Sequence, residues 1–260
     1  RGLEEDLGVA LFLRDNRSVS LTHEGKLFQA YARETLGDWK QIRQQLLAES
    51  ETLAGEIRIY CSVTASYSFL YELLSEFRLR HPRIEIKLHT GDPASAIARV
   101  QRGAEDVAIS ARPDTLPPGL AFRSMTISPL VFIAPDDGTD WRHLEGSRQA
   151  AGKSEHWARV PVILSEQDLA RQRVDDWFRA LKVQPQVYAQ VSGNEAIVSM
   201  VGLGFGVGVV PKIVLDNSPL GSRVRVLNVR PKLAPYDVGL CALERRLKDP
   251  IIRALWSQLR

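Results

Sequence analysis

Five short polar segments hold the residues best suited to bind a small molecule, because each lies at the end of an expected strand. They are rich in hydroxyl, amide and glycine residues: 62–66 (Ser-Val-Thr-Ala-Ser), 90–92 (Thr-Gly-Asp), 128–129 (Ser-Pro), 165–167 (Ser-Glu-Gln) and 192–194 (Ser-Gly-Asn). Hydroxyl groups and free backbone N–H groups at the start of a helix suit a carboxylate or a phosphate. The pattern therefore predicts a site for a small anion.

The position of these segments in the fold decides whether they act together. In open α/β sheets, ligands bind outside the carboxyl ends of the strands. Any one of these serines is explained more simply as an ordinary helix N-cap, but four of the segments fall at corresponding positions of two expected lobes and could line one cleft. The candidate ligand-binding residues are Ser62, Thr64, Ala65, Ser66, Ser128, Gln167, Gly193 and Asn194.

Other kinds of chemistry find no positive support in the sequence. The three glycines at 204, 206 and 208 follow an expected helix and precede a strand, whereas a dinucleotide-binding fingerprint needs the opposite order. The histidines lack the spacing of metal ligands. A Ser/His/Asp triad stays open, because its members are neighbours only in space, but no nucleophile-elbow pattern occurs. We expect neither an enzyme nor a bound cofactor or metal.

Composition fits a soluble protein with a core of ordinary size. The 260 residues suit one large domain or two smaller ones, and 44% of them are hydrophobic. A net charge of +3 permits a nucleic-acid partner without requiring one. Cys61 and Cys241 lie in apolar runs, which is typical of a reducing cytosol, although a disulfide between them stays open. No signal peptide or membrane span is evident, so we expect a cytoplasmic protein. Because the chain starts at Arg1 without methionine, we expect it to be part of a longer one.

Alternating strands and helices predict an α/β fold with two lobes. Residues 56–109 follow a βαβαβ pattern, which implies a parallel sheet, and residues 160–210 repeat it. An extended run over 122–134 is interrupted at Pro129, where the chain is expected to leave one sheet for another. Residues 136–159 are expected to be a surface loop, and 250–259 a closing helix. Lobe I would comprise 55–128 and 236–260, and lobe II 129–235.

A long amphipathic helix is expected over residues 22–54. Thr22 can cap its start, and Gly55 is its natural stop. Its apolar residues recur at alternating intervals of four and three, as in a coiled-coil seam: Phe28, Ala32, Thr35, Trp39, Ile42 and Leu46. Such a stripe needs a partner, which is either the rest of its own chain or a second copy. Because the helix joins two regions of different composition, we favour a dimer contact.

The first 21 residues are expected to form the end of a helix and a hairpin with a basic tip. Most such tips are only solvated turns. The order of the residues nevertheless resembles the second half of the winged helix-turn-helix of LysR-type transcriptional regulators: Leu3-Glu4-Glu5-Asp6-Leu7-Gly8, Leu11-Phe12-Leu13-Arg14, Arg17, Leu21-Thr22 and Gly25. In that family a wing and a linker helix follow the recognition helix, most of which would precede Arg1. The resemblance implies that Arg14 and Arg17 of the wing contact DNA.

The same resemblance covers the two lobes, which would form the effector-binding domain of the family. Four stretches resemble the members that control branched-chain amino-acid synthesis: 61–68, 85–92, 176–179 and 195–201. This likeness implies a homodimer or homotetramer that binds DNA. It also implies an effector that is acetolactate or acetohydroxybutyrate, with its carboxylate at 64–66 and its hydroxyl and ketone near Ser128, Gln167 and Asn194. The alternatives are a cytosolic solute-binding protein with the same lobes and an enzyme acting on small acids.

Overall fold

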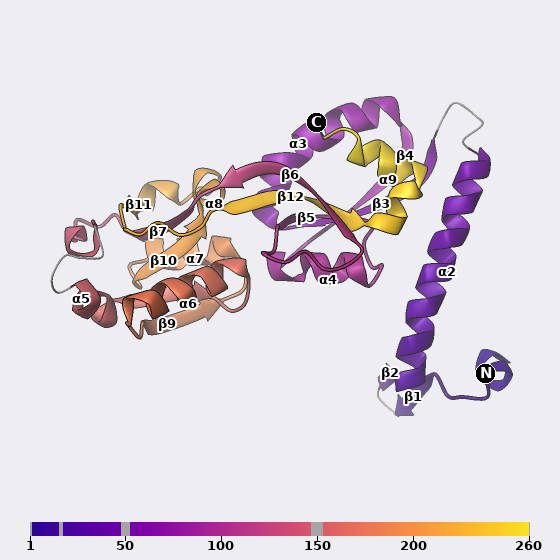
Figure 1. The fold of residues 1–260 in the computed structure, drawn as a ribbon, viewed down its shortest axis with the longest axis horizontal. Coiled ribbons are helices and arrows are strands. Elements are labelled where there is room, and N and C mark those ends of the chain that lie inside the picture. Colours follow the sequence, from indigo (N-terminus) through magenta and orange to yellow (C-terminus); the bar gives the residue numbers. More distant parts are fainter. Residues whose placement is uncertain (1, 16–17, 48–52, 147–152, 260) are drawn as a thin grey trace.

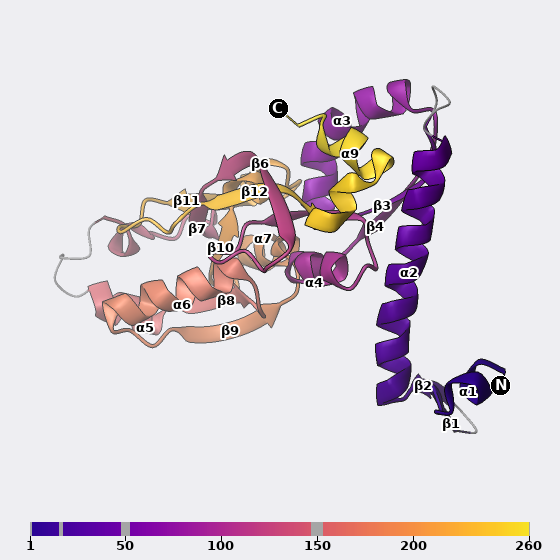
Figure 2. The ribbon, with the colours of Figure 1, turned by 45° about the vertical axis from the view of Figure 1, so that its right-hand side comes forward.

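The computed structural model describes residues 2–15, 18–47, 53–146 and 153–259. Two α/β lobes lie end to end, and a single long helix stands beside one of them (Figure 1). This helix, α2 (His23–Leu47), has a small hairpin at its far end, away from both lobes (Figures 1 and 2).

The N-terminal hairpin has the expected form. Helix α1 (Gly2–Leu7) precedes strands β1 (Phe12–Asp15) and β2 (Ser18–Leu21), which pair antiparallel. Between them, residues 16 and 17 lie outside the described part of the chain. The prediction of a helix end followed by a two-stranded ribbon is confirmed.

Helix α2 is fixed firmly to this hairpin. The Thr22 hydroxyl accepts a hydrogen bond from the Gly25 N–H (2.8 Å) and donates one to the Ala10 carbonyl (2.7 Å), so the expected N-cap is present. A Cβ at Gly25 would lie 2.0 Å from the Leu11 carbonyl oxygen. Only glycine therefore allows the helix to approach the hairpin so closely.

The predicted end of the long helix is wrong. Helix α2 extends to Leu47, and residues 48–52 lie outside the described part of the chain. Gly55 does not cap a helix but belongs to strand β3 (Ala54–Cys61), where its φ is 147°. Glycine ends helices in one context and enters strands in another, so its presence alone could not locate this boundary.

Lobe I is built on a sheet of order β4-β3-β5-β12-β6. Strand β3 pairs parallel with its neighbours β4 and β5, and β12 pairs antiparallel with β5 and β6. The bounds are β4 (Arg83–Thr90), β5 (Val107–Ala111), β6 (Leu120–Ser128) and β12 (Tyr236–Leu243). The helices are α3 (Val63–Arg80), η1 (Pro93–Ser95), α4 (Ala96–Gln101), η4 (Glu244–Lys248) and α9 (Pro250–Trp256).

Lobe II is built on a second sheet, of order β11-β7-β10-β8-β9. Its strands are β7 (Leu130–Pro135), β8 (Pro161–Ser165), β9 (Gln186–Val191), β10 (Val207–Pro211) and β11 (Val224–Leu227). Its helices are η2 (Arg142–Leu144), α5 (Lys153–Arg159), α6 (Leu169–Leu181), α7 (Asn194–Gly202), α8 (Lys212–Asp216) and η3 (Gly221–Arg223).

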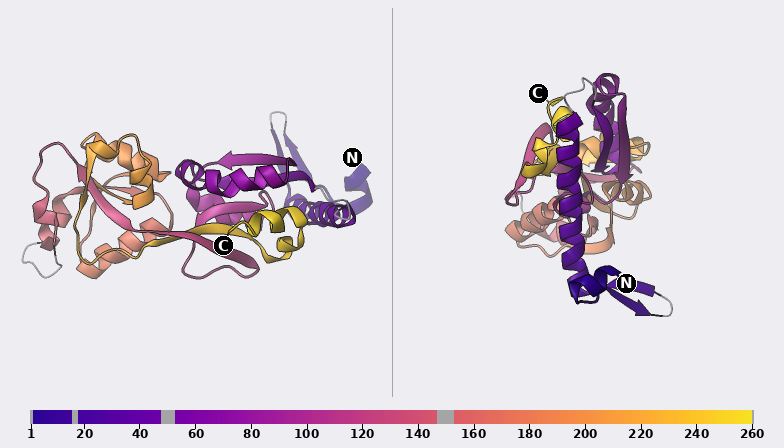
Figure 3. Two further views of the ribbon diagram at one scale, coloured as in Figure 1. Left: turned by 90° about the horizontal axis from the view of Figure 1, so that it is seen from above. Right: turned by 90° about the vertical axis from the view of Figure 1, so that its right-hand side faces the viewer.

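Two extended segments join the lobes (Figure 1). Strand β6 ends at Ser128 in the first sheet and β7 begins at Leu130 in the second, so the predicted change of sheet at Pro129 is confirmed. The chain returns from β11 to β12, which lies beside β6 in lobe I. Seen from above, the molecule is narrowest between the lobes, where these two segments connect them (Figure 3).

The interpretation of residues 136–159 as a plain surface loop is wrong. The segment includes η2 and α5, and it places Leu144 and Trp157 in the core with at most 1% of their surface exposed. The Trp157 ring packs against Phe132 and Trp177, with centroids 5.1 and 5.2 Å apart. Because the segment is rich in Asp, Gly and Ser, its composition did not indicate that Leu144 and Trp157 would be buried. Residues 147–152 lie outside the described part of the chain.

Candidate ligand-binding site

A cavity of about 620 Å³ lies between the two lobes. Lobe I contributes the start of α3, the turn before α4 and the end of β5, whereas lobe II contributes the starts of α6, α7 and α8. Most of these segments follow the carboxyl ends of strands that run parallel to a neighbour, which is where ligands of open α/β sheets bind.

The start of α3 binds a carboxylate that belongs to the other lobe. Ser62 caps the helix by accepting a hydrogen bond from the Ala65 N–H (3.1 Å). The Thr64 N–H is left for another acceptor and donates to Glu195 Oε1 of α7 (2.9 Å), and the Thr64 hydroxyl donates to the same oxygen. This position therefore has the chemistry expected for an anion site, with backbone, hydroxyl and helix dipole all favouring negative charge.

Asn194, in the first turn of α7, lines the cavity and has an unused hydrogen-bond acceptor. Its side chain is 6% exposed, and its Oδ1 is buried without a hydrogen-bond partner. A buried carbonyl oxygen of this kind normally has a donor, so its environment favours a ligand with a hydroxyl or an N–H group. Gly193 makes this approach possible, because the turn into α7 requires a φ of 85°.

The far wall of the cavity is polar and is held across both lobes. The Arg173 guanidinium donates to the Ala234 carbonyl (2.9 Å) and lies 3.5 Å from the Asp114 carboxylate. It also stacks 5.5 Å above the ring of Tyr236. Burial raises the pKa of the Tyr236 hydroxyl well above its usual value of 10.0, so this group is a neutral hydrogen-bonding residue at physiological pH.

Two carboxylates, those of Asp114 and Asp168, line the cavity, and a third, that of Glu195, contacts the lining residue Thr64; each already has a partner. Asp114 pairs with Arg173, Asp168 accepts a hydrogen bond from the Arg171 N–H (2.7 Å), and Glu195 is held at the start of α3. Among the described residues that line the cavity there is no lysine or arginine. An anion would therefore be bound by helix N-termini and hydroxyl groups rather than by a cationic side chain.

The sequence predicted eight ligand-binding residues, of which the structure places five on the cavity wall. Those on the wall are Ser62, Thr64, Ala65, Gln167 and Asn194. Ser66, Ser128 and Gly193 are not among the lining residues. The Ser66 hydroxyl turns back to the Val63 carbonyl (2.6 Å), and the buried Ser128 hydroxyl accepts from the Ile213 N–H (3.2 Å). These two hydroxyls thus bind the backbone of the protein, although neither residue is the N-cap of a helix.

The residue that sequence reasoning missed is Glu195. It directly follows the candidate Asn194, so the sequence did point to this turn of the chain. Its contact with Thr64, however, joins residues 131 positions apart in two different lobes. No local pattern reports such a contact. Asp168 and Tyr236 were missed for the same reason, since they reach the cavity only through the packing of the lobes.

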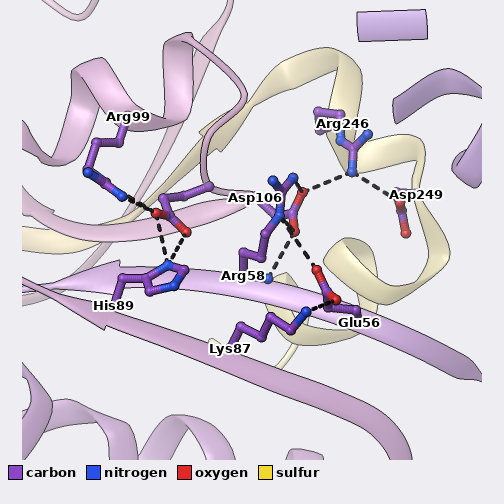
Figure 4. A network of polar contacts seen from close by, with 9 residues as sticks. Glu56, Arg58, Lys87, His89, Arg99, Asp106, Arg246 and Asp249 are labelled. Atoms are coloured by element: carbon purple, nitrogen blue, oxygen red, sulfur yellow. Dashed lines mark hydrogen bonds and ion pairs between the residues drawn. The ribbon is translucent and has the colours of Figure 1, made fainter. Parts of the chain in front are cut away.

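A polar network ties the edge of lobe I to its C-terminal helices (Figure 4). At its centre, the Asp106 carboxylate accepts hydrogen bonds from the Arg58 N–H (2.9 Å) and guanidinium (3.0 Å) and from the Arg246 guanidinium (3.0 Å). Arg246 also lies 3.5 Å from Asp249, which caps α9. Asp106 is 7% exposed, so this carboxylate is nearly removed from water.

The same C-terminal region contacts helix α2. Arg245 forms an ion pair with Glu34, and the Arg246 guanidinium lies so close to Gly37 that a Cβ there would be 2.6 Å from its Nη1. Figures 1 and 2 show α9 and the preceding turn beside α2. The long helix is thus positioned against lobe I through residues 245 and 246.

The candidate DNA and dimer contacts lie on the N-terminal part of the chain. Arg14 is in β1 and Arg17 lies outside the described residues. Along α2, Trp39 is 63%, Ile42 45% and Leu46 72% exposed, whereas Phe28 and Ala32 are half-buried. The apolar side chains of the second half of the stripe are therefore accessible in a single chain.

Together, two α/β lobes with a cavity between them define a protein of the two-lobed ligand-binding type, which here follows a long helix and a hairpin. A family model of the LysR substrate binding domain matches residues 50–260. The chain belongs to the LysR family of transcriptional regulators. Its two lobes are arranged as in the effector-binding domains of that family, which share their architecture with periplasmic binding proteins.

Known proteins resemble the chain along nearly its whole length. The HTH-type transcriptional activator IlvY of Salmonella typhimurium is 43% identical over 260 residues, which cover 99% of this chain and 86% of that protein. IlvY of Haemophilus influenzae is 40% identical over 258 residues, covering 99% and 87%. Among solved structures, the effector binding domain of QuiR in complex with shikimate is 21% identical, has a TM-score of 0.66 and covers 79% of this chain and 95% of that one. In the described part of the chain, no helix is both long and apolar enough to cross a membrane.

Proposed function

We propose that the chain is the sensing part of an activator of branched-chain amino-acid synthesis genes, and that its effector is acetolactate or acetohydroxybutyrate. The identity of 40–43% to IlvY proteins supports this role. In the proposed division, residues 1–21 end the winged helix, helix α2 is the linker, and residues 55–260 form the effector-binding domain. The protein would act in the cytoplasm on DNA.

One observation carries the proposal for the ligand. The start of α3 already binds a carboxylate, that of Glu195, and Asn194, whose buried Oδ1 has no hydrogen-bond partner, lines the cavity that Thr64 also lines. A 2-hydroxy acid matches this arrangement, because its carboxylate fits the Thr64 donors and its hydroxyl can donate to Asn194. The ketone oxygen would accept from Gln167 at the cavity wall.

The test compares acetolactate with the same acid lacking its hydroxyl group, 2-methylacetoacetate, by isothermal titration calorimetry. The parent chain should prefer acetolactate, since a neutral hydrogen bond contributes about 0.5–1.5 kcal/mol, roughly a 2- to 13-fold difference in affinity. In Asn194→Ala this preference should disappear. Equal binding of both acids to the parent chain, or a preference that survives the substitution, would show that Asn194 does not bind the hydroxyl.

Two further elements of the proposal concern macromolecular partners. The accessible stripe of α2, with Trp39 63% exposed, supports a homodimer or homotetramer held through this helix. The wing residues Arg14 and Arg17 would contact DNA phosphates. Because only the short helix α1 and the hairpin are described before α2, the chain alone should bind DNA weakly, without sequence preference and with steep salt dependence. Operator-selective binding of this chain in a gel-shift assay at physiological salt would contradict that expectation.

A solute-binding protein with the same lobes is the alternative from another class. The hairpin β1–β2 and its tight junction with α2 at Gly25 favour the regulator, since neither is needed for ligand capture by the lobes. The relatives above are named transcriptional activators rather than transport proteins or enzymes.

A further inference from the structure

The carboxylate of Glu195 occupies the position that the proposed effector's carboxylate would need. Its Oε1 accepts both the Thr64 N–H (2.9 Å) and the Thr64 hydroxyl at the start of α3. Two carboxylates cannot share these donors without placing like charges in contact. An acid that binds here must therefore displace Glu195.

The position of Glu195 in α7 is compatible with such a displacement. The residue is half-buried, and it lies in the first turn of α7, where the helix dipole favours an acidic side chain. Its backbone carbonyl accepts from the Ser199 hydroxyl (3.1 Å), a contact that does not involve the carboxylate. The carboxylate can thus turn toward water while α7 stays intact.

We infer that Glu195 is a tethered competitor of the effector, which sets the affinity threshold for carboxylates and couples their binding to a contact between the lobes. The inference rests on the proposed function and deepens it. In the free protein Glu195 fills the anion position and joins lobe II to Thr64 of lobe I. A carboxylate that enters takes over the Thr64 donors and breaks this bond between the lobes.

The threshold follows from simple competition. The apparent affinity of a ligand is reduced by the fraction of protein in which its site is already filled. When a simple anion such as acetate binds, it forms hydrogen bonds with Thr64 that replace those of Glu195. The net gain in free energy is small, so acetate binds poorly. An acid with a second group that contacts Asn194 gains an interaction that Glu195 does not replace. Removing the competitor should raise the affinity for every carboxylate but leave a neutral ligand unaffected.

The experiment measures binding of acetolactate and of its neutral counterpart acetoin, which lacks the carboxylate, to a graded series. In Glu195→Gln the amide oxygen can still accept from Thr64 but carries no charge, whereas Glu195→Ala has no acceptor. We expect acetolactate to bind more tightly in the order parent, Glu195→Gln, Glu195→Ala, with a gain of about tenfold or more at the end of the series. Acetoin affinity should stay constant. Weaker or unchanged acetolactate binding in both variants overturns the inference.

A matched control and a double substitution sharpen the result. Glu166 is an exposed carboxylate in the same lobe that accepts from the Ser192 hydroxyl (3.0 Å), whereas Glu195 accepts from Thr64, so Glu166→Gln should bind acetolactate like the parent. In the parent background, Thr64→Val weakens both the binding of the effector and the competing contact of Glu195. It should therefore cost about tenfold more affinity in the Glu195→Ala background than in the parent. Equal costs in both backgrounds would mean that Glu195 does not compete.

Hydrogen–deuterium exchange separates failure of this inference from failure of the proposed effector. Without any ligand, the peptide covering residues 62–66 should exchange faster in Glu195→Ala than in the parent, because the Thr64 amide loses its acceptor. If acetolactate binds none of the variants but this peptide is deprotected, the effector is another acid and the contact between the lobes stands. If the peptide exchanges equally in both proteins, the contact is absent and the inference is wrong.

Discussion

Replacing Asp106 with asparagine tests whether the polar network of lobe I stabilises the fold. The substitution keeps the volume of the side chain and removes the charge that faces both Arg58 and Arg246, each with a guanidinium nitrogen 3.0 Å from Oδ1. Asp106 is 7% exposed, so solvent cannot replace the lost partner. Removing one member of a buried ion pair costs about 3–5 kcal/mol.

The expected magnitude lies at the lower end of that range. Arg58 is 30% exposed and has Glu56 at 3.9 Å, and Arg246 keeps Asp249 at 3.5 Å, so neither cation is left entirely without a counter-charge. About 3 kcal/mol corresponds to a fall in unfolding temperature of roughly 6–12 °C for a chain of this size. Differential scanning calorimetry would measure the shift, with urea denaturation as a second measure of stability.

The control is Asp140→Asn, since Asp140 also binds an arginine but at the surface. Its carboxylate lies 2.9 Å from Arg142, and the two side chains are 60% and 80% exposed. Exposed pairs of this kind contribute little, so the variant should melt like the parent. If Asp106→Asn melts no lower than Asp140→Asn, the network does not stabilise lobe I and the reasoning from burial is refuted.

Three further predictions follow from individual side chains. Burial raises the pKa of the Asp249 carboxyl above 3.8, so its ionisation lowers the stability of the fold as the pH rises above that value. Asparagine can still cap α9 but does not ionise. Asp249→Asn should therefore be no less stable than the parent at pH 7, and the difference should vanish in acid. A clear loss of stability at pH 7 would contradict this. Burial raises the pKa of Cys61 to about 11 and that of Cys241 to about 12. Iodoacetamide at pH 8 should therefore label neither thiol until urea unfolds the chain. Rapid labelling of the folded protein would show that one of them is accessible. Trp39→Asp should abolish self-association through α2 in sedimentation velocity, and a variant that associates like the parent would remove this helix face from the dimer contact.

Periodicity was enough to predict most elements of the lobes. Ile84 and Ile86 alternate with polar residues in β4, and the change of sheet at Pro129 followed from the missing N–H of proline. Boundaries set by glycine were harder, as Gly55 shows. Residues 136–159 were predicted to be a loop because most of them are polar. The burial of Trp157 within this segment was therefore not predicted.

The site was predictable only as far as local chain geometry determines it. The start of a helix after a strand reveals its donors, which is why Thr64 and Asn194 were found. Whether a hydroxyl such as that of Ser128 turns inward or serves its own backbone depends on packing around it. The pairing of Thr64 with Glu195 depends on how the lobes close, and no property of either sequence segment encodes that on its own.

The junction at Gly25 turns helix α2 and its hairpin into a single lever. With the helix held against lobe I near Glu34 and against the hairpin at its first turn, the arm between the two attachments spans 11 residues, about 16 Å at 1.5 Å per residue. A tilt of about 10° at the Glu34 end would displace the hairpin by about 3 Å, close to the rise of one base pair along a duplex. Because the hairpin is fixed to the first turn of the helix, such a tilt would move the hairpin together with the helix.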